Sequence, residues 1–301
     1  MAVRALAIRV GDADEAYRVS VNKGAIGSTA PHTLVDTATG TTQVLSEVKL
    51  YGEVVLRYIS GDYVGPGLPN YQKVDGPEVS LGIERLDHCV GNVSNLLLSV
   101  DYICNFTGLH QFAEFTAEDV GTVDSGLNSM VLANNSEMIL LPINEPTFGT
   151  RRKSQIQTYL EQNEGAGVQH MALKTSDIFH TLAEMRKRSL LGGFEFMPRP
   201  SDAYYAALPT RIGTELSAEQ YTRIEALGLL VDKDEAGILL QIFTKPVGDR
   251  PTLFFEIIQR IGCMTEVQGQ MEQSAGCGGF GKGNFAELFK SIEEYEKSLD
   301  V

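Results

Sequence analysis

The 301-residue sequence has no tryptophan, few cysteines and a deficit of positive charge. Its 39 acidic residues outnumber its 25 basic residues, a balance that disfavours binding to the phosphate backbone of nucleic acid. No apolar run approaches the length of about 18 residues that a membrane span needs, and no secretory signal pattern opens the chain. The composition, 43% hydrophobic and 21% charged, is typical of a globular protein with a sizeable core.

The four cysteines are too sparse for a disulfide scaffold, and no two of them have the C-x-x-C spacing of a zinc or redox motif. They are Cys89, Cys104, Cys263 and Cys277. We therefore expect reduced thiols that serve mainly as packing residues in a cytoplasmic protein.

An internal repeat organises the chain. Residues 5–12, 88–95 and 170–177 are short apolar stretches, each ending in Gly or Ser followed by Asp or Asn. That Asp or Asn is placed to cap a helix, which the patterns predict over residues 13–21, 96–106 and 178–189. β-rich pieces follow at residues 44–48 and 50–59, 127–133 and 137–143, and 237–244 and 253–259. Each unit thus predicts a strand, a helix and about three strands, an α+β fold with mixed sheets.

Residues 60–80 are rich in glycine and proline and predict a linker. We therefore expect a small N-terminal domain with its linker over residues 1–80. A larger domain of two units and a C-terminal helix should occupy residues 81–301. Its last unit carries an insertion, roughly residues 199–226, rich in proline, tyrosine and polar residues.

Three residues form a candidate metal site. Where the first unit has Ala5, the other two have His88 and His170 at the equivalent strand position. Glu256 interrupts a strongly apolar strand, and a buried carboxylate needs a partner. Two imidazoles and one carboxylate on three strands form the facial triad that suits non-haem Fe(II), one ion per chain.

Other interpretations of these residues stay open at this point. A histidine in a strand is most often a hydrogen-bonded core residue, and Glu256 could instead form a salt bridge, for example with Arg260 or with a lysine on a neighbouring strand. His32, which follows Pro31 in an expected loop, and His180, in a helix pattern, are interpreted as surface residues.

Longer motifs around these residues resemble plant-type 4-hydroxyphenylpyruvate dioxygenases. They are residues 86–91, 112–115, 126–129, 141–146, 153–157, 167–170, 240–245 and 276–285. The resemblance runs over essentially the whole chain. It implies the vicinal oxygen chelate fold, in which βαβββ modules form open curved sheets and a barrel that holds the iron.

The resemblance also implies an activity, the conversion of 4-hydroxyphenylpyruvate and O2 to homogentisate and CO2 in tyrosine and phenylalanine catabolism. His88, His170 and Glu256 would hold the Fe(II). The implied catalytic polar residues are Gln155, Gln169, Gln241, Ser129 and Asn144. The implied substrate-binding residues are Phe243, Phe280, Phe285 and Asn284.

The glycine-rich residues 276–283 nearly match a phosphate-binding loop, but Gly283 replaces the hydroxyl residue that would hold Mg²⁺. The preceding residues 265–274 are polar and predict no strand. We expect a flexible loop leading into a C-terminal helix that Asn284 caps and that lies across the mouth of the iron site. The apolar face of this helix has helical spacing and comprises Phe285, Leu288, Phe289, Ile292, Tyr295 and Leu299.

The resemblance implies four modules, whereas three are found, so the chain is expected to be truncated at its N-terminus. The sheet within residues 1–80 should then expose apolar surface or an unpaired edge. Two alternatives stay open: hydroxymandelate synthase-like activity, or a truncated, non-catalytic paralogue that acts by association with a full-length subunit. We expect a homodimer, and a plastid location is open if a targeting peptide is missing.

Overall fold

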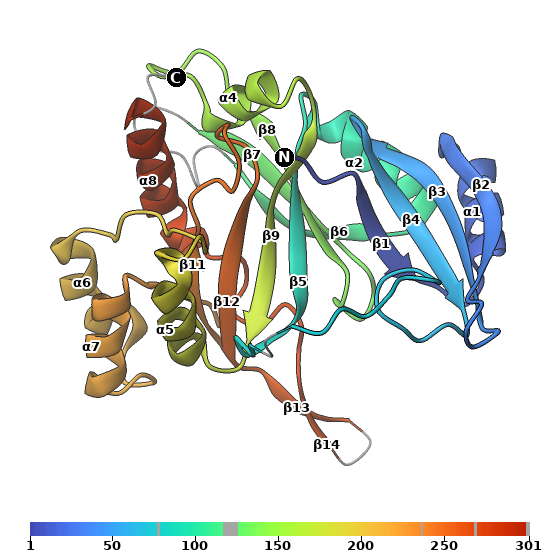
Figure 1. Cartoon of the computed structure of the whole chain (residues 1–301). Coiled ribbons are helices and arrows are strands. Elements are labelled where there is room, and N and C mark those ends of the chain that lie inside the picture. The colour runs from blue at the N-terminus through green and yellow to red at the C-terminus, as the bar shows by residue number, and fades with distance from the viewer. Residues whose placement is uncertain (77–78, 117–125, 236, 268–269, 299–301) are drawn as a thin grey trace.

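The computed structural model describes residues 1–76, 79–116, 126–235, 237–267 and 270–298. It confirms the α+β class: strand–helix–strand units follow one another and build two curved sheets (Figure 1). The first strand of each unit pairs in parallel with its last strand: β1 with β4, β5 with β8 and β9 with β12. Among the described residues, no helix combines the length and hydropathy that crossing a bilayer requires.

The first unit forms a four-stranded sheet in the order β1-β4-β3-β2, with α1 against it. Its elements are β1 (Ala5–Arg9), α1 (Ala13–Asn22), β2 (Gly27–Val35), β3 (Thr42–Tyr51) and β4 (Val54–Gly61). Asp12 caps α1 as predicted, accepting hydrogen bonds from the backbone N–H groups of Asp14 and Glu15. The predicted strand over residues 50–59 is wrong at its start, because a turn at Gly52 separates β3 from β4. His32 is exposed as expected, but it lies in β2 rather than in a loop.

The other two units share an eight-stranded sheet in the order β10-β11-β12-β9-β5-β8-β7-β6. β5 and β9 pair antiparallel at its centre and so join the two units. The second unit comprises β5 (Ile83–Asn92), α2 (Leu96–Thr107), β6 (His110–Phe115), β7 (Leu127–Ala133) and β8 (Leu140–Pro146). α4 (Gln155–Gln162) leads to the third, with β9 (Gly167–Thr175), α5 (Ile178–Ser189), α6 (Asp202–Ile212), α7 (Ala218–Leu227), β10 (Leu230–Lys233), β11 (Gly237–Phe243) and β12 (Phe254–Gly262).

Most predicted elements of these units are confirmed within a few residues, with Asn95 and Asp177 as helix caps. The predicted strand over residues 137–143 starts later, because Glu137 has a positive φ of 57° in the turn before β8. The expected insertion contains two helices, α6 and α7, which lie beside α5 (Figure 1).

The segment after β12 differs from the sequence-based predictions. Residues 265–274 were expected to form no strand, yet β13 (Met264–Val267) and β14 (Gln270–Gln273) pair as a hairpin below the main sheet (Figure 1). The hairpin returns the chain, so that Cys277 forms a disulfide with Cys263. The prediction of reduced thiols is therefore wrong for this pair. Cys89 and Cys104 are free.

A short helix η1 (Lys282–Asn284) and α8 (Phe285–Ser298) end the described chain. Leu288, Phe289 and Ile292 of α8 are buried, whereas Leu299, which was predicted to extend its apolar face, lies outside the described residues. The N-terminal sheet and α2 share one hydrophobic cluster, in which Leu50 and Val54 pack with Ile103 and Phe106. The core therefore runs without interruption from the first unit into the second.

Candidate metal centre

Three adjacent strands position the predicted triad. His88 lies on β5, His170 on β9 and Glu256 on β12, and these strands are neighbours in the sheet. Ala172 of β9 pairs with His88 of β5 on one side and with Glu256 of β12 on the other. His170 precedes Ala172 by two residues and so projects from the same face of the sheet. The short Ala172 side chain leaves room for His88 and Glu256 to meet above it.

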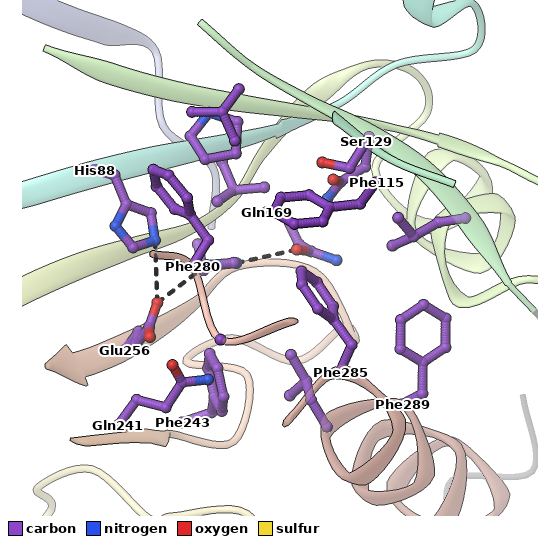
Figure 2. A pocket seen from close by; sticks show the side chains of 18 of the residues that line it. His88, Phe115, Ser129, Gln169, Gln241, Phe243, Glu256, Phe280, Phe285 and Phe289 are labelled. Carbon is purple, nitrogen blue, oxygen red and sulfur yellow. Dashed lines mark hydrogen bonds and ion pairs between the residues drawn. The ribbon is translucent and has the colours of Figure 1, made fainter. Parts of the chain in front are cut away.

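The ligand atoms of the triad converge. Nε2 of His88 lies 3.2 Å and Nε2 of His170 lies 3.4 Å from the same Oε2 atom of Glu256 (Figure 2). One ligand atom from each residue lies within 4.8 Å of the others, and all three residues are buried. The arrangement can hold a metal ion, and its two nitrogens and one carboxylate suit a first-row transition metal.

The remaining ring nitrogens are held by oxygen atoms. Nδ1 of His88 lies 2.9 Å from Oδ1 of Asp87, and Nδ1 of His170 lies 3.0 Å from Oε1 of Gln169. Since both oxygens accept hydrogen bonds, each Nδ1 donates and each Nε2 is left to bind a metal. The residue that precedes each histidine therefore selects its tautomer.

Burial and charge act on the triad in opposite senses. Burial alone would lower the pKa of His88, but hydrogen bonds with Asp87 and Glu256 raise that pKa to about 9. For His170 burial dominates and the pKa is lowered. Burial alone would raise the pKa of Glu256, yet the two histidines lower it to about 2. The carboxylate is thus kept anionic, as a metal ligand must be.

Glu256 does not form the salt bridge with Arg260 that was the alternative interpretation. Arg260 instead pairs with Asp87, at 2.8 Å and 3.1 Å. The sequence reasoning missed both residues. A signal was present only for Arg260, a second charged residue in the mostly apolar strand β12. Asp87 did not stand out, because β5 also carries Glu84 and Arg85.

A cavity opens above the triad. The predicted polar residues Gln155, Gln169, Gln241, Ser129 and Asn144 all line it, as do Phe243, Phe280 and Phe285. Other lining residues were not predicted to do so: Val90, Phe115, Leu127, Val131, Pro142, Gly281, Leu288 and Phe289. The Phe280 ring lies edge to face with His88 (Figure 2). The Phe243 ring lies edge to face with His170.

Asn284 does not line this cavity. It directly precedes α8, where a cap belongs, but its Oδ1 accepts a hydrogen bond of 2.8 Å from the hydroxyl of Tyr204. Gln241 has a different feature: its buried Oε1 has no hydrogen-bond partner within the described structure. A ligand in the cavity that donates a hydrogen bond would satisfy this oxygen.

No known family profile matches the sequence. The chain is similar along its whole length to proteins described as 4-hydroxyphenylpyruvate dioxygenase. Those of Daucus carota and Arabidopsis thaliana are 62% and 58% identical to it, and the chain covers 68% of each. The protein of that description from Neurospora crassa is 38% identical, with 97% of this chain and 69% of that protein matched.

Among solved structures, a mutant 4-hydroxymandelate synthase from Streptomyces coelicolor superposes with a TM-score of 0.74 at 24% identity. The match covers 98% of this chain and 77% of that one. At this identity the likeness supports the fold alone, which is the predicted vicinal oxygen chelate arrangement.

Proposed function

Because the chain belongs to the 4-hydroxyphenylpyruvate dioxygenase family, we propose that its cavity binds 4-hydroxyphenylpyruvate and O2 and yields homogentisate and CO2. The chain is an oxidoreductase of tyrosine catabolism. The observation that carries the proposal is the buried His88–His170–Glu256 cluster at one end of a cavity lined by neutral amides and phenylalanine rings.

His88, His170 and Glu256 would hold one Fe(II) per chain. Two nitrogens and one carboxylate leave further coordination positions for a chelating keto acid and for O2. When bound, the iron supplies the Lewis acidity and redox chemistry that oxidative decarboxylation, ring hydroxylation and side-chain migration require. Asp87 and Gln169 keep the Nε2 atoms free for the metal by accepting from Nδ1.

The polar lining suits a substrate with a phenol and a keto acid. Gln155, Gln241 and Asn144 offer hydrogen bonds without adding a charge that would compete for the metal. The unpartnered Oε1 of Gln241 supports a hydrogen bond from the substrate, whose phenolic hydroxyl is a donor. Phe243 and Phe285 would hold the aromatic ring in the alignment that attack on it needs.

The apolar residues of α8 would exclude water from the cavity. Phe289 is fully buried and packs with Phe115 and Ile156, while Phe285 is packed against the same cluster. Phe285 and Phe289 line the cavity from α8, and Phe280 lines it next to His88 (Figure 2). A dry cavity strengthens polar contacts to the substrate and limits side reactions with water.

The test is to supply the full chain with Fe(II), ascorbate and 4-hydroxyphenylpyruvate and to identify the product by chromatography. Homogentisate is expected. Hydroxymandelate would contradict the proposed ring chemistry, and no product would favour a non-catalytic paralogue. Glu256→Gln should abolish turnover. Glu47→Gln is the matched control, since Glu47 pairs with Arg57 in the N-terminal sheet away from the cavity and should leave turnover unchanged.

We also propose that residues 1–80 form a unit distinct from residues 81–301, although the two share a hydrophobic cluster, and that two copies of the chain associate. Residues 62–82 contain no described helix or strand, which supports the division. β1 and β2 are the outer strands of the N-terminal sheet, so a second copy could pair with either edge. Sedimentation velocity should give the mass of a dimer, and limited proteolysis should cut first between residues 62 and 82. A monomer or a cut elsewhere would contradict these proposals.

A further inference from the structure

Arg260 and Asp87 form an ion pair whose two side chains are fully buried. Nη2 of Arg260 donates to Oδ1 of Asp87 at 2.8 Å, and its Nε donates to Oδ2 at 3.1 Å. Removing two charges from water is costly, and apolar residues of similar size often stabilise a core equally well. The pair therefore calls for a reason besides stability.

Asp87 is in direct contact with the metal centre. The Oδ1 atom that accepts from Arg260 also accepts from Nδ1 of His88 at 2.9 Å. The guanidinium thus fixes the carboxylate, and the carboxylate fixes the plane and tautomer of the imidazole. A rotation of the Asp87 carboxylate would break either its two-point contact with Arg260 or its contact with His88.

The other end of the guanidinium holds the glycine-rich loop. Nη1 of Arg260 donates to the backbone carbonyls of Cys277 and Gly279. These carbonyls flank the chain that leads to Phe280, whose ring centroid lies 5.5 Å from that of His88. The guanidinium carbon lies 5.7 Å from the centroid of the same ring. The Arg260 side chain therefore contacts both Asp87, which holds His88, and the loop that carries Phe280 over His88.

We propose that Arg260 is a positioning residue that couples the orientation of His88, through Asp87, to the closure of the loop at residues 277–281 over the metal site. The inference rests on the proposed metal triad. Arg260 touches neither the substrate nor the metal in this role. Its effect on both passes through Asp87 and through Phe280.

Arg85 provides a matched control. Its Nη2 lies 3.4 Å from Oδ2 of the same Asp87, but its side chain is a quarter exposed, and its other hydrogen bond goes to the carbonyl of Leu86 rather than to the loop. Arg85→Gln thus removes a cation beside Asp87 without touching the loop. Arg260→Lys keeps the buried charge but loses the planar two-point fork. Asp87→Asn keeps the shape of the side chain and removes its charge.

The experiment titrates Co(II) into the metal-free full chain and its variants and follows Kd and the visible spectrum. Hydrogen exchange of the amides at residues 278–281 is measured on the same samples. Near-ultraviolet circular dichroism verifies that each variant is folded. We expect Asp87→Asn and Arg260→Lys to raise Kd about 10-fold to 100-fold and to alter the cobalt spectrum. Loop exchange should accelerate in Arg260→Lys, and Arg85→Gln should match the wild type in every measurement.

Two results would overturn the proposal. Wild-type Kd and spectrum in both Asp87→Asn and Arg260→Lys would mean that the ion pair serves stability alone. An equal loss in Arg85→Gln would mean that charge near Asp87 matters and the loop contact does not. If neither the wild-type chain nor Glu256→Gln binds Co(II), the assignment of the metal triad is wrong, and the role proposed for Arg260 is then wrong as well.

Discussion

Gly281 is placed where a methyl group would press on the cavity. Its φ is 75°, and a Cβ built there would lie 2.6 Å from Oε1 and 2.8 Å from Nε2 of Gln241. Gln241 is buried on β11, and its Oε1 has no partner among the described residues. Gly281→Ala should therefore displace the amide that we assign to substrate binding.

Gly279→Ala separates this effect from backbone strain. Gly279 has a similar φ of 66°, but the nearest atom to its Cβ would be an oxygen of Asp234 at 3.4 Å, an ordinary contact. A left-handed backbone costs a residue with a side chain about 1–2 kcal/mol, so both variants should lose about that much free energy of unfolding. Only Gly281→Ala also moves Gln241. Loss of one hydrogen bond to the substrate, about 1 kcal/mol, corresponds to about a fivefold rise in KM.

The assay compares urea unfolding and steady-state homogentisate formation in the two variants and the wild type. Similar losses of stability with a raised KM in Gly281→Ala alone would support the role of Gln241. A wild-type KM in Gly281→Ala would refute it, because the amide cannot stay in place beside the new methyl group. A KM raised equally in Gly279→Ala would show that loop strain alone weakens substrate binding.

Four further changes test other parts of the site. Glu256→Gln should keep the circular dichroism spectrum and weaken Fe(II) binding, measured as iron content after dialysis; unchanged iron would remove Glu256 from the triad. Phe243→Ala or Phe285→Ala should raise KM about fivefold and weaken inhibition by planar 1,3-diketones, and unchanged inhibition in both would place these rings outside the substrate site. Removing residues 286–301 should lower turnover and let O2 consumption exceed homogentisate formation, whereas tightly coupled turnover would make α8 a structural tail. The pKa of His88 is raised to about 9 without metal, so a divalent cation that binds at its Nε2 must displace a proton from the ring. The affinity for Co(II) should therefore rise about tenfold per pH unit from pH 6 to 8, and an affinity independent of pH would contradict this.

Much of the local structure could be predicted because its causes are local. Asp12, Asn95 and Asp177 each cap the helix that follows, through contacts within three residues of the cap. The triad could be predicted for a different reason. His88 and His170 recur at one position of a repeat, and Glu256 stands as a charge in an apolar strand, so each departs from the pattern that packing alone would give.

The hairpin β13–β14 and its disulfide could not be predicted in this way. Its apolar residues, Met264, Val267 and Met271, do not alternate with polar ones, so the sequence pattern marks no strand there. The pairing of the two backbones holds the hairpin together. Cys263 and Cys277 meet only because the hairpin reverses the chain between them. Asn284 likewise has a capping position but hydrogen-bonds to Tyr204, which the chain brings from a distant helix.

The sequence by itself determined the α+β repeat, the start of each repeat helix and the residue types that bind the metal, because periodicity and capping act between near neighbours. Only the tertiary structure decided which charges meet. Arg260 lies four residues after Glu256 on one strand, yet it pairs with Asp87, which is 173 residues away. The register of β5, β9 and β12 places Glu256 and His88 opposite the same residue, Ala172, and an irregularity between Leu86 and His88 leaves Asp87 outside the regular pairing. A pairing of this kind depends on how strands align across the sheet, which no local pattern in the chain encodes.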